Sequence, residues 1–277
     1  MSPVGTLVFA GTTSHVSGIV RDPDVSPEHS ASLAAAWDTM AADIAVADPD
    51  VVVLVSPDHQ EAFGLENLPV FAIGSARTHR AIREHGIPVD DVAGDPVAAQ
   101  ALHASLLAQE FDVSIAHEMP LDHGFLVPVK RLGLQERHVV PVYVSCNNPP
   151  LPTLNRCRGL GIALRRAIAS LPAETTVAVL GLGALSHWVA IPRMGEINEA
   201  WDHQILGWLE TGDLDSIAAM TDAEILEAAG NGALEIRTWL VAAACAGGKA
   251  RTLAYAPMYP WVTGIGVTEL EVAGVAG

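Results

Sequence analysis

Four histidines of this chain follow apolar stretches, each beside small or turn-forming residues: His15, His59, His123 and His187. Apolar stretches of this kind predict buried strands. In an open α/β sheet, ligands bind in the crevice outside the carboxyl ends of the strands. Imidazoles gathered at that edge could hold a metal ion and move protons near neutral pH. The first expectation is therefore a shared histidine site at one edge of a sheet.

His15 and His59 follow the first two predicted strands and would project from the same edge if those strands are parallel neighbours. Two neutral imidazoles suit iron, zinc, copper or nickel. A carboxylate as third ligand would complete the facial triad of non-haem Fe(II) oxygenases, which leaves coordination positions open. Glu235 is the candidate, because it is the one acid in an otherwise uncharged stretch that leads into an apolar helix.

Each of these residues also has an ordinary structural interpretation. A single histidine near a strand end is usually a loop residue, and the helix dipole favours a glutamate in a first turn without any metal. The joint pattern of the four histidines is what favours a site. The segment Gly181-Leu182-Gly183 lacks the third glycine of a dinucleotide fingerprint. Six other histidines lie in helix-like or polar surroundings and are expected to be mostly solvated: His29, His79, His85, His103, His138 and His203. His117-Glu118 does not extend to the H-E-x-x-H motif of zinc proteases.

Strand-like and helix-like segments alternate along the chain, which predicts a layered α/β fold with a mostly parallel central sheet and helices on both faces. Expected strands cover residues 4–10, 51–55, 113–116, 139–145, 176–182, 251–256 and 262–271, and expected helices cover 26–46, 96–109, 153–170 and 233–245. Thr221 and Glu224 form a capping box that predicts a further short helix. No repeat or credible linker interrupts the pattern, so one domain over residues 1–277 is expected.

Composition narrows the class of protein. Half of the 277 residues are hydrophobic and 17% are charged, which predicts a sizeable core. Lys and Arg number 15 against 32 Asp and Glu, and a net charge of -17 argues against nucleic-acid or membrane-surface partners. No secretory signal or bilayer-length apolar run is found. The three cysteines are expected to be free thiols in a reducing cytoplasm: Cys146, Cys157 and Cys245.

Taken together, the histidines and Glu235 resemble the site residues of the class III extradiol ring-cleaving dioxygenases, the family that contains the β subunit of protocatechuate 4,5-dioxygenase and the 2,3-dihydroxyphenylpropionate 1,2-dioxygenases. Five positions match in the same order over nearly the whole chain. The resemblance implies that His15, His59 and Glu235 bind Fe(II). It implies that His187 is the catalytic acid/base and His123 the second active-site histidine. It also implies a homo-oligomer, with a separate small α subunit in some members.

The implied reaction cleaves the ring of a catechol-type substrate next to its two hydroxyls and incorporates both atoms of O2. A neutral histidine can accept a phenolic proton, and we assign this step to His187. Two alternatives stay open: a zinc-dependent hydrolase on the same ligands, and a non-catalytic binding protein of the same fold. Around the substrate tail, the aromatic stretch 255–261 could line the pocket, and Arg193 and Arg237 could meet a carboxylate.

Overall fold

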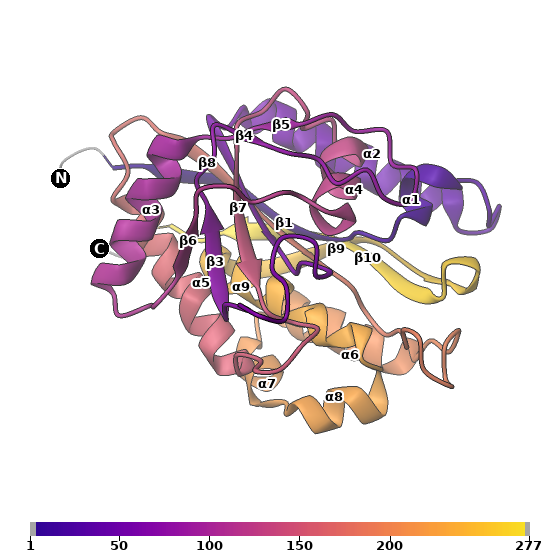
Figure 1. Cartoon of the computed structure of the whole chain (residues 1–277). Helices are drawn as coiled ribbons and strands as arrows, with labels where there is room; N and C mark the ends of the chain where they lie inside the picture. The colour runs from indigo at the N-terminus through magenta and orange to yellow at the C-terminus, as the bar shows by residue number, and fades with distance from the viewer. Residues whose placement is uncertain (1–3, 275–277) are drawn as a thin grey trace.

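The computed structural model describes residues 4–274 and has at its centre an eight-stranded sheet in the order β6-β3-β7-β2-β8-β1-β10-β9 (Figure 1). Four neighbouring strands run parallel: β7 (Val139–Val144), β2 (Val51–Ser56), β8 (Thr176–Gly183) and β1 (Thr6–Ser14). On one side, β3 (Phe71–Gly74) pairs antiparallel with β7, and β6 (Ser114–Ala116) pairs parallel with β3. On the other side, β10 (Thr263–Val272) pairs antiparallel with β1, and β9 (Gly247–Met258) pairs antiparallel with β10. The predicted layered α/β fold with a mostly parallel sheet is confirmed.

Helices cover both faces of the sheet (Figure 1). One side carries α3 (Pro96–Ala108), α5 (Leu154–Ala169), α6 (Glu199–Thr211), α7 (Leu214–Ala219), α8 (Asp222–Ala228) and α9 (Ile236–Ala246). The other side carries α1 (Gly18–Arg21), α2 (Ser30–Ala47) and α4 (His123–Arg131). A separate pair of short strands, β4 (Thr78–His79) and β5 (Val92–Ala93), lies outside the main sheet.

Strand β2 shows why a continuous apolar run forms the middle of this sheet. Val51, Val53 and Val55 belong to the core on the α5 and α9 side, whereas Val52 and Leu54 belong to the core on the α2 side. Successive side chains of a strand point to opposite faces. A strand covered by helices on both faces therefore has no polar face, as expected for a parallel sheet.

Several element boundaries differ from those expected. Strand β1 continues past Gly11 to Ser14, because residues 11–14 pair with β8 on one side and most of them with β10 on the other. Helix α2 begins at Ser30, since Ser26 instead opens a turn whose carbonyl accepts from the amides of His29 and Ser30. Strand β3 and helices α4 and α6 were not expected at all.

Burial contradicts one expectation about the histidines. His79 is 1% exposed, not solvated, and one of its ring nitrogens lies 2.9 Å from the carbonyl of Met119. Gly74 and Gly94 leave room for this ring, because a Cβ at either position would lie 2.8 Å from it.

The expected free thiols are found, as all three cysteines are unpaired and buried. None of the helices in residues 4–274 has the length and apolarity that a membrane crossing requires.

The expected capping box begins helix α8. The Thr221 hydroxyl accepts from the Glu224 amide, and the Glu224 carboxylate accepts from the Thr221 amide at 2.7 Å. We expect Thr221→Ala to lower the free energy of unfolding by about 1 kcal/mol, because it removes one of these bonds. Urea denaturation would measure this, with Thr211→Ala as the control, whose hydroxyl only bonds back within its own helix. Equal midpoints for the two variants would contradict the prediction.

Candidate active site

Three of the predicted site residues follow parallel strands that are neighbours in the sheet. β1 ends at Ser14, directly before His15; β2 ends three residues before His59; and β8 ends four residues before His187. The strand order β2-β8-β1 brings their carboxyl ends to one edge. This is the edge at which the sequence places the site.

Glu235 reaches the same edge from a different element. It ends the 3-10 turn η1 (Gly232–Glu235) and precedes α9, whereas the sequence placed it in the first turn of one continuous helix. The Thr238 hydroxyl lies 2.9 Å from both the Leu182 and Glu235 carbonyls and fixes this turn against β8. Gly183 makes the close approach possible, since a Cβ there would lie 2.6 Å from the Glu235 carbonyl oxygen.

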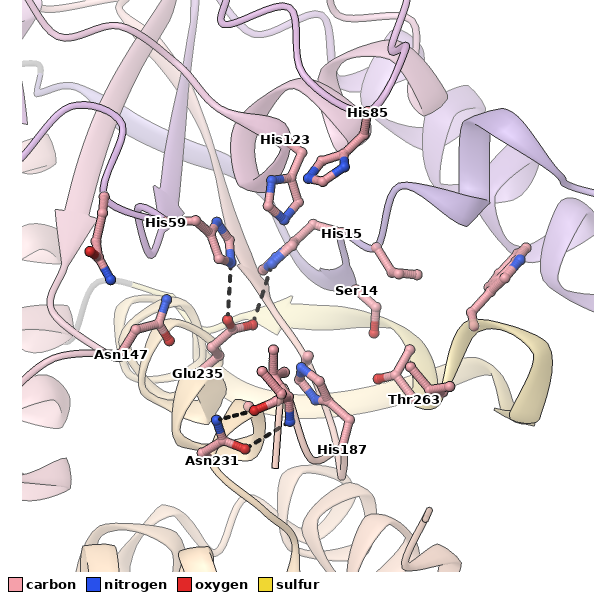
Figure 2. A pocket seen from close by; sticks show the side chains of 18 of the residues that line it. Ser14, His15, His59, His85, His123, Asn147, His187, Asn231, Glu235 and Thr263 are labelled. Atoms are coloured by element: carbon pink, nitrogen blue, oxygen red, sulfur yellow. Dashed lines mark hydrogen bonds and ion pairs between the residues drawn. The ribbon is translucent and has the colours of Figure 1, made fainter. Parts of the chain in front are cut away.

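The carboxylate of Glu235 bridges two imidazoles (Figure 2). One oxygen lies 3.3 Å from His15 Nε2 and the other lies 3.3 Å from His59 Nε2. Glu235 is 3% exposed, and its Oε2 has no hydrogen-bond partner among the described residues. Buried polar atoms normally have a partner. A divalent metal ion between these three side chains would provide one, so the donor set fits such an ion.

The charges of the three groups match this interpretation. Burial lowers the pKa of His15 to about 3, so its ring is neutral. Burial raises the pKa of Glu235, but its interactions with the neighbouring His15 and His59 rings, including the hydrogen bond from His59, outweigh this and hold it at about 2. Burial likewise lowers the pKa of His59, yet hydrogen bonds to Asp122 and Glu235 bring it well above its usual value. The proton on His59 Nε2 therefore occupies the side of the ring that faces Glu235, and a metal cation bound by these residues would replace it.

Asp122 orients the ring of His59. Its Oδ2 lies 2.7 Å from His59 Nδ1 and accepts from the His59 amide at 2.7 Å. Burial raises the pKa of Asp122, but the bonds to His59 and the charges of His59 and His123 bring it down to about 2. The ionised carboxylate keeps the Nδ1 proton in place and leaves Nε2 facing Glu235. The sequence alone did not predict that Asp122 orients His59, although an Asp directly before His123 is a helix-capping signal.

We expect Asp122→Asn to weaken metal binding by roughly 10- to 100-fold, because an amide holds the imidazole less firmly than a carboxylate. A chelator-competition titration would measure the affinity. Asp95→Asn is the matched control, because Asp95 also caps a helix through its side chain but bonds no histidine. Asn caps a helix as well as Asp does. Equal affinities for the two variants would contradict the role of Asp122.

His123 is the first residue of α4 and lies close to the other two imidazoles. Its ring stacks on that of His59 with centroids 4.0 Å apart. Its Nδ1 lies 2.6 Å from Glu84 Oε1, which also accepts from the His123 amide at 2.8 Å. Ligand nitrogens of His15, His59 and His123 lie within 4.8 Å of one another. The geometry thus places His123 as well as Glu235 beside His15 and His59.

His187 lies across the site from His123, on the other side of Glu235 and His15 in Figure 2. Its Nδ1 lies 2.9 Å from the Leu185 carbonyl oxygen, which can only accept, so Nδ1 carries the proton and Nε2 is free. The His187 ring fits here only because residue 232 is a glycine: a Cβ at Gly232 would lie 2.0 Å from Nε2. From the sequence, the Gly-Asn-Gly segment at 230–232 predicted only the end of a helix.

Asp202, on α6, anchors the loop that carries His187. It accepts from the amide and hydroxyl of Ser186 at 2.7 and 2.9 Å, and from the Tyr255 hydroxyl at 2.8 Å. Burial raises the pKa of Asp202 to about 6. No sequence pattern indicated this residue, because it lies within a helix that was not expected.

The raised pKa of Asp202 makes a testable contribution to stability. A carboxyl whose folded pKa is raised stabilises the fold below its unfolded pKa, 3.8 here, and loses that contribution as the pH rises through about 6. We therefore expect the stability of wild type relative to Asp202→Asn to fall by about 2 kcal/mol between pH 4 and pH 7. Urea denaturation of both proteins across this range would measure it. A constant difference would contradict the prediction.

The site opens into a pocket of about 530 Å³ that His15, His59, His123, His187 and Glu235 all line. This volume suits a small ligand. His85, expected only to be solvated, also lines the pocket, and its ring centroid lies 5.0 Å from that of His123. The structure therefore brings all five predicted site residues together and adds His85 beside them.

Neither arginine considered for a substrate carboxylate lines the pocket. Arg237 is fully buried and donates to the Pro152 and Leu234 carbonyls and to Asp222. Arg193 pairs with Glu196 at 2.7 Å. Of the aromatic stretch 255–261, Trp261 lines the pocket. The hydroxyls of Tyr255 and Tyr259 instead bond to carboxylates on α6, those of Asp202 and Glu199.

Comparisons with known proteins agree with the geometry. Residues 10–266 match the family described as the catalytic LigB subunit of aromatic ring-opening dioxygenase. A 2,3-dihydroxyphenylpropionate/2,3-dihydroxicinnamic acid 1,2-dioxygenase of Burkholderia vietnamiensis is 29% identical over 79% of this chain and 83% of its own length. A gallate dioxygenase of Pseudomonas putida is 36% identical over 68% of this chain and 57% of its own length.

A solved structure supports the fold alone. The crystal structure of an uncharacterized protein from Escherichia coli K12 is 12% identical, covers 94% of this chain and 99% of its own, and has a TM-score of 0.58. The family match spans both the strands that carry His15, His59 and His187 and the turn that carries Glu235. The chain therefore belongs to the LigB family of aromatic ring-opening dioxygenases, as an extradiol ring-cleaving enzyme.

Proposed function

We propose that this protein is a non-haem Fe(II)-dependent extradiol dioxygenase that opens the ring of a catechol-type substrate and incorporates both atoms of O2. The observation that carries the proposal is the convergence of His15, His59 and Glu235, with 3.3 Å between the carboxylate and each imidazole. His15, His59 and Glu235 form the two-histidine, one-carboxylate set that is typical of such iron sites.

When bound, Fe(II) would supply a Lewis acid with open positions for the two catechol oxygens and for O2. The protein's own part is to fix these ligands and to handle protons. Asp122 holds His59 in the tautomer whose Nε2 is available. Glu235 and Asp122 remain ionised, and His15 remains neutral, as ligands and their supporting groups must be.

We assign the acid/base role to His187. Nδ1 of His187 donates a hydrogen bond to the Leu185 carbonyl, so Nε2 is free to accept a phenolic proton and to return it later to an oxygen of the opening ring. His123 has the matching arrangement, since its Nδ1 bonds to the Glu84 carboxylate and leaves Nε2 for the substrate. The two imidazoles on opposite sides of Glu235 would hold the substrate ring between them (Figure 2).

The proposal is tested by reconstituting metal-depleted protein anaerobically with Fe(II), Zn(II) or no metal, and by screening a panel of catechols with an oxygen electrode. We expect oxygen uptake only with Fe(II), about one iron per active site, and a yellow ring-opened product. Mass spectrometry after reaction in ¹⁸O₂ would find two labelled atoms per product molecule. Zinc-dependent hydrolysis without oxygen uptake, or ligand binding without any turnover, would favour the two alternatives instead.

We further propose, on the family resemblance, a cytoplasmic homo-oligomer whose partners are a small aromatic diol and O2. A separate small α subunit is the other partner that the resemblance allows. Light scattering of the purified protein would measure the assembly. Activity of that protein alone would mean that turnover needs no α subunit.

A further inference from the structure

We infer that the substrate carries an uncharged side chain, such as an alkyl, aryl or amide group, in place of a carboxylate. The inference rests on the proposed ring cleavage and concerns the rest of the same pocket. It also separates this chain from the relatives reported above, whose names describe phenylpropionate, cinnamic acid and gallate, all of them carboxylic acids.

The pocket lining has no basic side chain other than histidine. Within residues 4–274, no Lys or Arg lines it. Away from the histidines and Glu235, one part of the wall is apolar, with Val16, Val189 and Trp261. Neutral amides also line the pocket, including those of Asn147 and Asn148. Such a wall can bury a hydrocarbon tail and hydrogen-bond a carbonyl or amide, but it offers no full positive charge to a carboxylate.

Carboxylates lie on the pocket wall and directly behind it. Besides Glu235 on the wall, Asp122 lies directly behind His59 and Glu84 directly behind His123. Asp58 is 5% exposed and is held by backbone amides of the segment 61–63. A second negative charge on the substrate would therefore lie among like charges, within a chain whose net charge is -17.

The one exposed imidazole of the lining does not change this balance. His85 Nε2 lies 3.4 Å from Glu84 Oε2, so any positive charge on His85 is already paired. The other imidazoles of the lining are assigned to binding the proposed metal ion or to proton transfer. A substrate carboxylate that bound to His85 Nε2 would compete with Glu84, which also holds the His123 ring.

The two arginines considered for a substrate carboxylate, Arg193 and Arg237, lie outside the pocket lining and are held by other partners. Arg193 pairs with Glu196, donates to the Glu227 carbonyl and lies 4.1 Å above the Trp188 ring. Arg237 is buried among its own acceptors. To bind a carboxylate, either arginine would have to lose these contacts first. For Arg237 these contacts are buried and costly to break, whereas Arg193 forms an exposed pair outside the pocket lining.

Matched substrates test the inference. The iron-loaded enzyme is given 3-(2,3-dihydroxyphenyl)propionate, its primary amide and 3-propylcatechol, which share the ring and differ at the end of the tail. We expect kcat/KM for the amide and for 3-propylcatechol to exceed that for the acid by tenfold or more. An acid that reacts as well as the neutral compounds would overturn the inference while supporting the ring cleavage. Failure of all three and of simple catechols would overturn both.

A pair of variants tests the cause. Val189 lines the pocket, is 46% exposed, and contacts Asn231 through its backbone. Val189→Arg adds a cation at the pocket wall, and Val189→Gln adds a polar side chain without the charge. We expect the arginine variant to raise the ratio of acid to amide kcat/KM at least tenfold over the glutamine variant, and added salt to reduce this gain. Equal ratios would show that charge does not select the tail and would overturn the inference.

Discussion

Glu235→Gln is expected to lose bound iron and to lower the rate of ring cleavage by about 1000-fold, which corresponds to about 4 kcal/mol. The amide has the shape of the carboxylate but no charge. It therefore leaves the cation without the one anionic ligand between the two imidazoles, each 3.3 Å from a Glu235 oxygen. Elemental analysis after desalting and oxygen uptake with a catechol would measure the two effects.

The same experiment distinguishes two possible ligand sets. Nitrogens of His15, His59 and His123 also lie within 4.8 Å of one another, so three imidazoles could hold the ion instead. In that case His123→Ala would lose the iron and Glu235→Gln would retain it. We expect the reverse, because Glu235 is the buried carboxylate that faces both other ligands. Glu227→Gln, on the exposed side of α8, is the control and should retain iron and activity.

The polypeptide pattern was enough to predict the edge at which the site forms. His15 and His59 follow strands whose apolar runs are recognisable without a structure. These two strands are not direct neighbours as expected, because β8 lies between them, but all three run parallel and therefore end at one edge. Glu235 was recognisable as an isolated acid, although its backbone proved to be a 3-10 turn. The fold class followed from the alternation of strands and helices, which does not depend on where each element ends.

The supporting residues could not be predicted because they depend on contacts between distant segments. Glu84 is 39 positions from His123, and Asp122 is 63 positions from His59. Helix α4 was missed because Pro128 interrupts its pattern, although Asp122 is a normal helix cap. His85 was expected to be solvated because its sequence surroundings are polar, and it is exposed, but only the folded chain places it against His123.

His187→Gln is expected to retain iron at the wild-type level and to lower kcat by roughly 100- to 10,000-fold, since general acid–base catalysis contributes about that much. His187 has no hydrogen bond to His15, His59 or Glu235; its Nδ1 is held by the Leu185 carbonyl and its amide by the Ala229 carbonyl. Glutamine can keep a hydrogen bond to Leu185 but cannot take up a proton near neutral pH.

Two readouts separate this catalytic role from a structural one. The acid limb of the pH profile of kcat/KM should disappear in His187→Gln, because the group that must be unprotonated is gone. His138→Gln, an exposed histidine that contributes only its backbone carbonyl to β2, should keep both the rate and the profile. An unchanged rate and an unchanged acid limb in His187→Gln would transfer the proton-transfer role to His123, whose ring faces the pocket from the other side of Glu235 (Figure 2).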